Sequence, residues 1–409
     1  MLTRLRRAFT HIPFWTRKFF SCFLRTHRSS LSHTTNPLAD AVLTTLRVAL
    51  ADGHTRLSLL AFYERVARVP ELRNAVAADI GNALQVLQQA QQIVLSETFV
   101  ALPHCVRAEQ EIADGFTLSG SRLLRLRTAT MSARLDAYKA ELSGEQRAAV
   151  VALAQSRFGI LTGAPGTGKT ATMKALVTVL ERAGYHIALT APTGRAAMRL
   201  QEATGQPART LHRFLRAHRV RHSAWWNWFF PADPEVIIVD EASMMDTFLM
   251  ARLMAVCTPH TKLILVGDVE QLPSVGPGQV LRDLITSGCV PVIELTANFR
   301  QGEGSQISAA AAAIKAGEVP DLPAPGERRA DCYFLEAETA AEAASLIVKA
   351  VTQSLPARCG ADPYQSIQVL TPKHRGTLGT ALLNARIQDA LADAPAPSAG
   401  LPTASASRG

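Results

Sequence analysis

Hydrophobic and polar positions follow two different periods along this chain. From residue 38 to about residue 140 the apolar positions recur with helical spacing, for example over 79–95, which predicts a small, mostly helical domain. Short apolar runs near 93–95 and 99–102 predict one β-ribbon within it. From residue 142 onward, short apolar runs alternate with helical segments. This alternation is typical of an α/β fold, a parallel sheet with helices on both faces.

The strand candidates of this α/β region are five short apolar runs, at 158–161, 186–190, 235–239, 262–266 and 291–295. A Gly/Pro-rich stretch at 317–326 predicts a boundary, beyond which a second α/β segment begins. Its expected strands are 332–335 and 366–370, and its expected helices lie near 338–354 and 377–392. The Pro-, Ser- and Ala-rich end of the chain is typical of a disordered tail.

The first strand-to-helix connection carries a phosphate-binding loop of the pattern G-x-x-x-x-G-K-[ST], made by Gly163, Ala164, Pro165, Gly166, Thr167, Gly168, Lys169 and Thr170. In this pattern, small residues let backbone N–H groups surround a phosphate. Lys169 then reaches the β- and γ-phosphate oxygens, and the Thr170 hydroxyl ligates Mg²⁺. A helix-compatible segment at 171–182 directs its positive end toward the anion. The sequence therefore predicts that the chain binds a nucleoside triphosphate.

Polar residues also follow two later strands. Asp240 and Glu241 come directly after the run 235–239; we expect Asp240 to hold Mg²⁺ through water and Glu241 to activate the attacking water. The alternative for this acidic pair is a helix N-cap. Asp268 and Gln271 follow the run 262–266. The Gln271 amide can contact both the γ-phosphate and the hydrolytic water.

Other candidates depend more on their surroundings. Gln146, shortly before the first strand, either contacts an adenine edge or is a solvated residue in a helix that Ser143 caps. Arg300 either reaches the γ-phosphate or lies solvated on the surface. Thr190 and Thr193, after the second strand, could hold a nucleic-acid phosphate at a helix start.

Basic and aromatic residues mix over 213–230, which contains four arginines, three tryptophans and three phenylalanines. Such a mixture suits single-stranded nucleic acid, whose bases stack and whose phosphates pair with cations. Packing of an insertion loop against the core is an equal alternative.

Composition limits the partners. The net charge is +9, but residues 1–39 hold seven Lys/Arg and no acid, so the remainder is nearly neutral and the charge alone does not indicate DNA binding. This leader could be a targeting peptide or bind a membrane surface or phosphates; we favour a poorly ordered extension because Pro13 interrupts any amphipathic helix.

No apolar run is long enough to span a membrane. The six cysteines form no C-x-x-C pair, which argues against a zinc site or disulfide scaffold and for a reducing, cytoplasmic location.

Taken in order, these motifs resemble those of superfamily 1 DNA helicases of the RecD type, the alpha subunit of exodeoxyribonuclease V and its stand-alone relatives. The matching stretches are 163–170, 191–196, 210–213, 240–243, 267–278 and 298–301. Residues 368–376 and Asn384 are similar to the start of the family's second motor domain, and 273–278 points to the stand-alone branch.

The resemblance covers roughly 38–392. It implies a helical domain at 38–140, a RecA-like ATPase domain at 141–318 and a partial second RecA-like domain at 319–392. Composition adds a basic leader at 1–37 and a disordered tail at 393–409.

The resemblance also implies an ATP- and Mg²⁺-dependent motor that moves 5′ to 3′ on single-stranded DNA and unwinds duplex ends in repair or recombination. Gln146 would contact adenine, Lys169 and Thr170 the phosphates and Mg²⁺, and Asp240 and Glu241 the metal and water. Gln271 would sense the γ-phosphate and Arg300 would stabilise it. The residues implied near the DNA strand are Thr193, His212, Ser274 and Val275.

The chain departs from the family after Leu370, where nothing supplies the family's Gln-Gly motif or the arginine motif that completes the ATP site. An arginine acting across the cleft is worth about 10³–10⁵ in rate. We therefore expect ATP binding with weak hydrolysis and little unwinding by this chain alone, unless another polypeptide supplies the second motor domain. The alternative is a non-motor, ATP-binding, DNA-associated subunit of a repair complex. A small-molecule kinase is a third option, against which the Gln271 and Arg300 motifs argue.

Overall fold

The computed structural model describes residues 37–69, 76–117, 134–136, 138, 141–221, 234–297, 305–326 and 330–392, without the side chains of 219–221. The chain divides into two compact units, Met1–Gln301 and Gly302–Gly409. The predicted leader up to residue 36, the aromatic stretch 222–233, Arg300 and the tail 393–409 lie outside the described residues.

The N-terminal part of the first unit combines helices with a small antiparallel sheet. Its helices are α3 (Pro37–Ala51), α4 (Leu59–Val66), α5 (Ala77–Gln89) and α6 (Pro103–Thr117). The predicted ribbon forms from β2 (Val94–Leu95) and β3 (Phe99–Ala101), and β1 (Arg56–Ser58) adds a third strand that the sequence did not predict. The helix expected over 79–95 ends at Gln89, because Gln91 adopts a left-handed conformation with φ of 56°.

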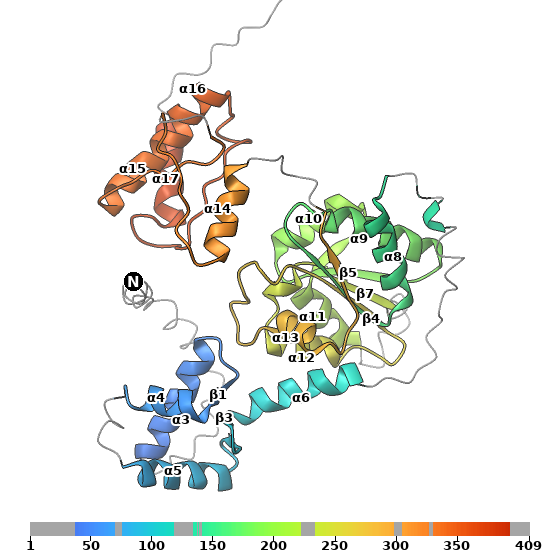
Figure 1. The fold of residues 1–409 in the computed structure, drawn as a ribbon, viewed down its shortest axis with the longest axis vertical. Coiled ribbons are helices and arrows are strands. Elements are labelled where there is room, and N and C mark those ends of the chain that lie inside the picture. The colour runs from blue at the N-terminus through green and yellow to red at the C-terminus, as the bar shows by residue number, and fades with distance from the viewer. Residues whose placement is uncertain are drawn as a thin grey trace, which may run out of the picture. The chain divides into compact units, whose positions relative to one another are not determined.

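A six-stranded sheet, parallel throughout, forms the core of the same unit (Figure 1). Its spatial order is β6 (Ala208–Thr210), β5 (Ile187–Ala191), β7 (Val236–Val239), β8 (Lys262–Val266), β4 (Phe158–Gly163) and β9 (Val292–Leu295). All five predicted strands are confirmed, with ends shifted by two residues at most. The edge strand β6 was missed because none of its three residues is fully buried and they form no apolar run.

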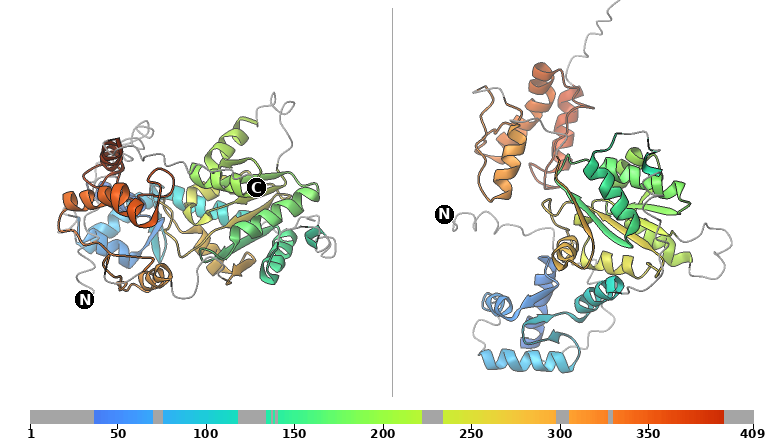
Figure 2. Two further views of the ribbon diagram at one scale, coloured as in Figure 1. Left: turned by 90° about the horizontal axis from the view of Figure 1, so that it is seen from above. Right: turned by 45° about the vertical axis from the view of Figure 1, so that its right-hand side comes forward.

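Helices lie on both faces of this sheet, as predicted (Figure 2). They are α8 (Gly144–Gln155), α9 (Lys169–Arg182), α10 (Gly194–Thr204), α11 (Leu211–Arg221), α12 (Thr247–Met254) and α13 (Val280–Ser287). Alternate strand residues enter two separate apolar clusters. Ile237 and Leu263 join the cluster with α11, α12, α13 and α6, whereas Ile238 and Ile264 join the cluster with α8, α9 and Leu200. This alternation shows that the sheet is buried on both sides.

The second unit contains helices α14 (Gln306–Lys315), α15 (Ala340–Lys349), α16 (Leu355–Cys359) and α17 (Thr380–Ala392), with a π-helical turn at Ala350–Ser354. The helices expected near 338–354 and 377–392 are therefore present. The strands expected at 332–335 and 366–370 are not: these residues form no ladder in the described part of the unit. Phe334 and Leu370 are 60% and 83% exposed. An apolar run becomes a strand only where a neighbouring strand pairs with it, which corrects the prediction.

The division between the units lies at residue 301, earlier than the boundary expected near 318. Helix α14 belongs to the second unit because Asp331 binds its first turn. Ser305 Oγ donates to Asp331 Oδ2 at 2.6 Å, and the Gln306 backbone N–H donates to Asp331 Oδ1 at 2.8 Å.

Candidate active site

The phosphate-binding loop joins the end of β4 to the start of α9. Gly163, Gly166 and Gly168 have φ values of 151°, 91° and 84°, which residues with a side chain rarely adopt. A Cβ atom added to Gly163 would lie 2.6 Å from the backbone oxygen of Leu295 on the adjacent strand β9. The loop therefore needs glycine both for its path and for its close contact with β9.

The phosphate-contacting side chains lie at the beginning of α9. Lys169 Nζ donates to the carbonyl of Gly163 at 2.5 Å and to that of Ala164 at 3.1 Å. Thr167 is buried and its hydroxyl donates to Ala164 O at 2.8 Å, whereas Thr170 is exposed in the first helical turn. The glycine-rich cradle, the helix N-terminus and the ammonium group together fit a nucleotide phosphate.

Asp240 and Glu241 follow β7, which is separated from β4 by β8 and ends on the same side of the sheet as the phosphate loop. The Asp240 N–H donates to Thr190 O at 2.9 Å, and Asp240 Oδ1 accepts the Glu241 N–H at 2.9 Å. The pKa of Asp240 is raised to about 6, chiefly by burial. The hydrogen bond from the Glu241 N–H and the charge of Lys169 lower it, whereas the charge of Glu241 raises it. The Asp240 carboxylate and the exposed Thr170 hydroxyl supply oxygen ligands, the kind that Mg²⁺ prefers.

Glu241 has a left-handed backbone, with φ of 52° and ψ of 40°. It precedes the 3₁₀ helix η2 (Ala242–Met244), but its side chain makes no capping hydrogen bond. The N-cap alternative for this carboxylate is therefore not realised. A non-glycine residue in this conformation costs about 1–2 kcal/mol, and such strain is found at functional sites.

Gln271 is held by the buried carboxylate of Asp268. Asp268 accepts the Glu270 N–H at 3.0 Å and the Gln271 Nε2–H at 3.2 Å. Asp268 is 3% exposed and follows β8, which pairs directly with β4. The amide predicted to contact the γ-phosphate thus lies at the same sheet edge as the phosphate loop.

Gln146 is buried and connects α8 to the phosphate loop. Its Oε1 accepts the Ser143 N–H at 3.0 Å, and its Nε2 donates to Thr167 O at 3.5 Å. Ser143 caps the helix, as the alternative predicted. The same alternative placed Gln146 in solvent, which is wrong because Gln146 is buried. Contact with adenine stays a prediction. Sequence reasoning missed the neighbouring Glu145, whose carboxylate binds residues after β9; only its adjacency to Gln146 could have pointed to it.

One DNA candidate is corrected by the structure. Thr190 is 1% exposed and its hydroxyl donates to Ile238 O at 3.0 Å, because it lies within the central strand β5. It cannot contact a nucleic acid from there. Thr193 accepts the Ala196 N–H and caps α10, and His212 is exposed on α11.

The loop after β8 carries the other DNA candidates. Ser274 Oγ lies 2.8 Å from the carbonyls of both Gly276 and Gly278, and Val275 is 97% exposed at the loop surface. These residues, Thr193 and His212 all follow the carboxyl ends of parallel strands. They therefore lie on the side of the sheet that holds the phosphate loop.

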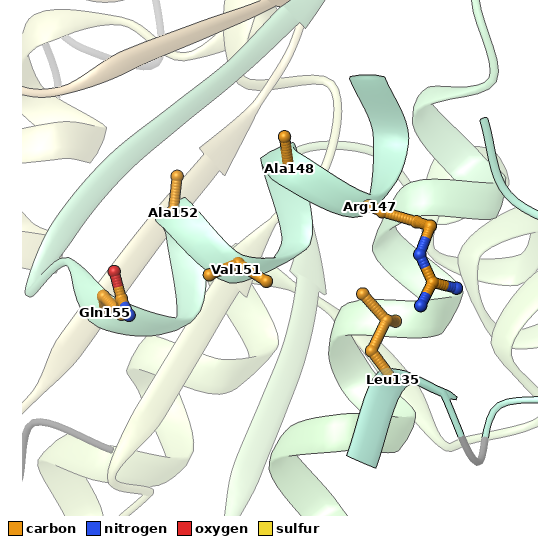
Figure 3. A pocket seen from close by; sticks show the side chains of 6 residues that line it. All are labelled: Leu135, Arg147, Ala148, Val151, Ala152 and Gln155. Atoms are coloured by element: carbon orange, nitrogen blue, oxygen red, sulfur yellow. The ribbon is translucent and has the colours of Figure 1, made fainter. Parts of the chain in front are cut away.

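A separate cavity of about 340 Å³ lies along the outer surface of α8 (Figure 3). Its walls come from Leu135, Arg147, Ala148, Val151, Ala152 and Gln155, and none of the predicted site residues lines it.

Within the described ranges, no cluster of His, Cys, Asp and Glu could bind a metal by itself, and no helix could cross a membrane. The phosphate loop is therefore the candidate site.

Comparison with known proteins agrees with these motifs. A family model described as an AAA domain matches residues 141–329. The chain is 36% identical over 310 residues to the ATP-dependent RecD2 DNA helicase of Deinococcus radiodurans, covering 73% of this chain and 40% of that relative. The matched part of the chain is similar to RecD-type superfamily 1 helicases.

Two further proteins are similar to parts of this chain. The RecBCD enzyme subunit RecD of Mycolicibacterium smegmatis is 42% identical over 212 residues, 42% of this chain and 36% of that subunit. The crystal structure of Pif1 helicase from Candida albicans aligns with 46% of this chain and 50% of its own, at 23% identity and a TM-score of 0.35. The chain spans about two fifths of the length of the two RecD relatives that it matches.

Proposed function

We propose that this chain binds ATP and Mg²⁺ at residues 163–170 and couples ATP hydrolysis to movement along single-stranded DNA. The observation that carries the proposal is the meeting of the phosphate loop, Asp240, Glu241 and Gln271 at one edge of a parallel sheet. The relative in Deinococcus radiodurans is named an ATP-dependent DNA helicase, and we extend that activity to this chain. The 5′-to-3′ direction rests on the family resemblance.

Each residue has a distinct task in the proposed hydrolysis. Lys169 leaves the Gly163 carbonyl and binds the β- and γ-phosphate oxygens. Thr170 and Asp240 hold Mg²⁺, which when bound neutralises charge on those oxygens. Gln271 orients the attacking water and Glu241 takes its proton as the water oxygen bonds to phosphorus and the bond to ADP breaks. Arg300 stabilises the charge on the transferred group.

The proposed DNA contacts lie on the same side of the sheet. Thr193, His212, Ser274 and Val275 follow three strands whose carboxyl ends share that edge. Gln271 lies two residues before Pro273, where the exposed loop begins. In the proposed motor, a movement of Gln271 that depends on the bound nucleotide therefore acts close to this loop. Coupling between nucleotide and DNA then has a short path through this loop. Because a chain that acts on DNA must be in the same compartment as the DNA, we infer that this chain is located in the cytoplasm.

A complete motor needs two lobes that close on ATP. We infer that hydrolysis at this site is slow unless a complete second motor domain, or another repair subunit acting as a partner, closes on it. Exposed apolar residues of the second unit, among them Phe334, Tyr364 and Leu370, favour such a partner. A non-motor, DNA-associated ATP-binding subunit is the alternative.

ATPase rate with and without single-stranded DNA tests the proposal, together with Lys169→Ala. DNA stimulation that Lys169→Ala abolishes supports the motor, and a fast rate contradicts the expected weak turnover. ATP binding without any DNA-dependent turnover, alone or with a second-domain polypeptide, supports the non-motor subunit. Absence of ATP binding overturns both functions.

A further inference from the structure

Two consecutive residues of α8, Glu145 and Gln146, bind the phosphate loop and the segment that adjoins it. Gln146 contacts the loop itself through Thr167, as described above. Glu145 instead receives hydrogen bonds from the segment that follows β9. Its Oε1 accepts the Thr296 N–H at 2.9 Å and the Thr296 hydroxyl at 3.0 Å, and its Oε2 accepts the Ala297 N–H at 3.3 Å.

The segment that Glu145 binds adjoins the phosphate loop. Leu295, the last residue of β9, pairs with Gly163 in the parallel ladder, and its carbonyl lies directly against Gly163. Thr296 follows at once, and Arg300 comes four residues later in the sequence. The first turn of α8 therefore connects the phosphate loop with the strand that leads to the predicted γ-phosphate arginine.

A carboxylate suits this connection better than other side chains. Its two oxygens accept three hydrogen bonds from two residues, and these bonds favour the ionised form, lowering the pKa of Glu145 below its usual value with the Thr296 N–H as the largest cause. An amide would offer one acceptor oxygen and turn an NH₂ group toward the Ala297 N–H. Charge-assisted bonds of this kind fix geometry more firmly than neutral ones.

We propose that Glu145 is a positioning residue that fixes the carboxyl end of β9 against the phosphate loop, at the point from which the sequence runs on to Arg300, the predicted γ-phosphate arginine. This role rests on the proposed ATP-dependent function. Its consequence is selective: Glu145 supports the binding and hydrolysis of ATP, which has a γ-phosphate, more than the binding of ADP, which has none.

The test compares affinities for a non-hydrolysable ATP analogue and for ADP by fluorescence titration, using the full chain and the variant Glu145→Ala. We expect the preference for the ATP analogue to fall by roughly ten-fold with ADP affinity almost unchanged, and any measurable kcat to fall by up to about 10²-fold, as small misplacements do. Glu141→Ala removes a nearby exposed carboxylate and serves as the matched control. Thr296→Ser keeps all donors and should retain the preference, whereas Thr296→Val lacks the hydroxyl and should lose part of it.

The outcomes separate the two proposals. Equal losses of ATP-analogue and ADP affinity, or no change in either, overturn the positioning role, because a purely structural contact moves both nucleotides alike. If the wild-type chain binds nucleotide but never hydrolyses it, the motor function fails while the affinity ratio still decides the role of Glu145. If it binds no nucleotide, both fail. Should Glu145→Ala not fold, the pair Thr296→Val and Thr296→Ser gives the same comparison.

Discussion

The side-chain amide of Gln271 donates through Nε2 to Asp268 Oδ2 at 3.2 Å, so a buried carboxylate sets the orientation of the predicted γ-phosphate sensor. With Nε2 held in this way, the carbonyl oxygen of the amide is the end that can accept a hydrogen bond from the attacking water. The sequence identified Gln271, but only the fold shows that Asp268 orients it.

Gln271→Glu should lower kcat by roughly 10²–10³-fold, as the loss of an oriented polar group at a reacting centre does. The new carboxylate would face that of Asp268 and could no longer donate to it. Steady-state ATPase assays measure the effect. Adding Asp268→Asn provides an amide donor to the new carboxylate, and we expect this double variant to regain part of the lost rate. If the double variant is as slow as Gln271→Glu alone, Asp268 does not orient residue 271.

Lys169→Ala should abolish ATP hydrolysis and weaken ATP binding. In the structure, Lys169 Nζ donates to the Gly163 and Ala164 carbonyls, so its ammonium group already lies at the loop that would hold the phosphates. Calorimetric ATP titration and phosphate release are the measurements. Lys174→Ala removes an exposed cation from the same helix and should leave both unchanged. Equal losses in the two variants would mean that general charge, and not the loop position, attracts the nucleotide.

The sequence was sufficient for the central sheet because a buried parallel strand is a continuous apolar run, as at β8, whose bounds matched the prediction. It failed where a strand depends on its partner. β6 forms without a fully buried residue because β5 lies beside it, whereas Phe334 and Leu370 lie in runs that form no ladder. An apolar pattern describes burial, and pairing depends on the neighbours that the fold provides.

The candidate site shows the same division. Lys169 and Asp240 were predictable because the loop pattern and the strand-ending acids have fixed spacings along the chain. The burial of Thr190 and the Glu145–Thr296 contact were not, because each depends on residues about 50 or 150 positions away. Long-range contacts of single polar side chains have no periodic signature in one sequence.

Asp240 should make the metal-free protein less stable at neutral than at acidic pH. Burial raises its pKa from 3.8 to about 6, so the folded state binds its proton more tightly than the unfolded state between these values. Stability then falls as pH rises through this window, by about 3 kcal/mol at most. Asp240→Asn removes this cost and keeps an oxygen for the Glu241 N–H.

Urea unfolding of the metal-free wild type and Asp240→Asn at pH 4 and pH 7.5 measures the difference. We expect the variant to be the more stable protein at pH 7.5 and the two to converge at pH 4. The variant should also lose Mg²⁺-dependent ATP binding. A stability difference that is the same at both values of pH would contradict the raised pKa.

Gly278→Ala should destabilise the loop that follows β8. Gly278 has φ of +93°, and an added Cβ would lie 2.0 Å from Thr247 Oγ1. Thr247 is buried and its N–H donates to Pro277 O, so it has little room to move. We expect a loss of roughly 1–3 kcal/mol in unfolding free energy, measured by urea titration. Gly205→Ala, with φ of +73° and open space around the added atom, should cost less.

Val275→Asp should weaken binding to single-stranded DNA without changing stability. Val275 is 97% exposed, so the new carboxylate displaces no packed neighbour. Beside a phosphate backbone it adds like-charge repulsion, worth about 1 kcal/mol at 4 Å in water and therefore roughly five-fold in affinity. Fluorescence anisotropy with a labelled oligonucleotide measures the effect, which should diminish at high salt because exposed charges are screened. Val319→Asp, at an 89% exposed position of the second unit, is the matched control. If both variants bind DNA equally well at low salt, the loop around Val275 is not part of the DNA path.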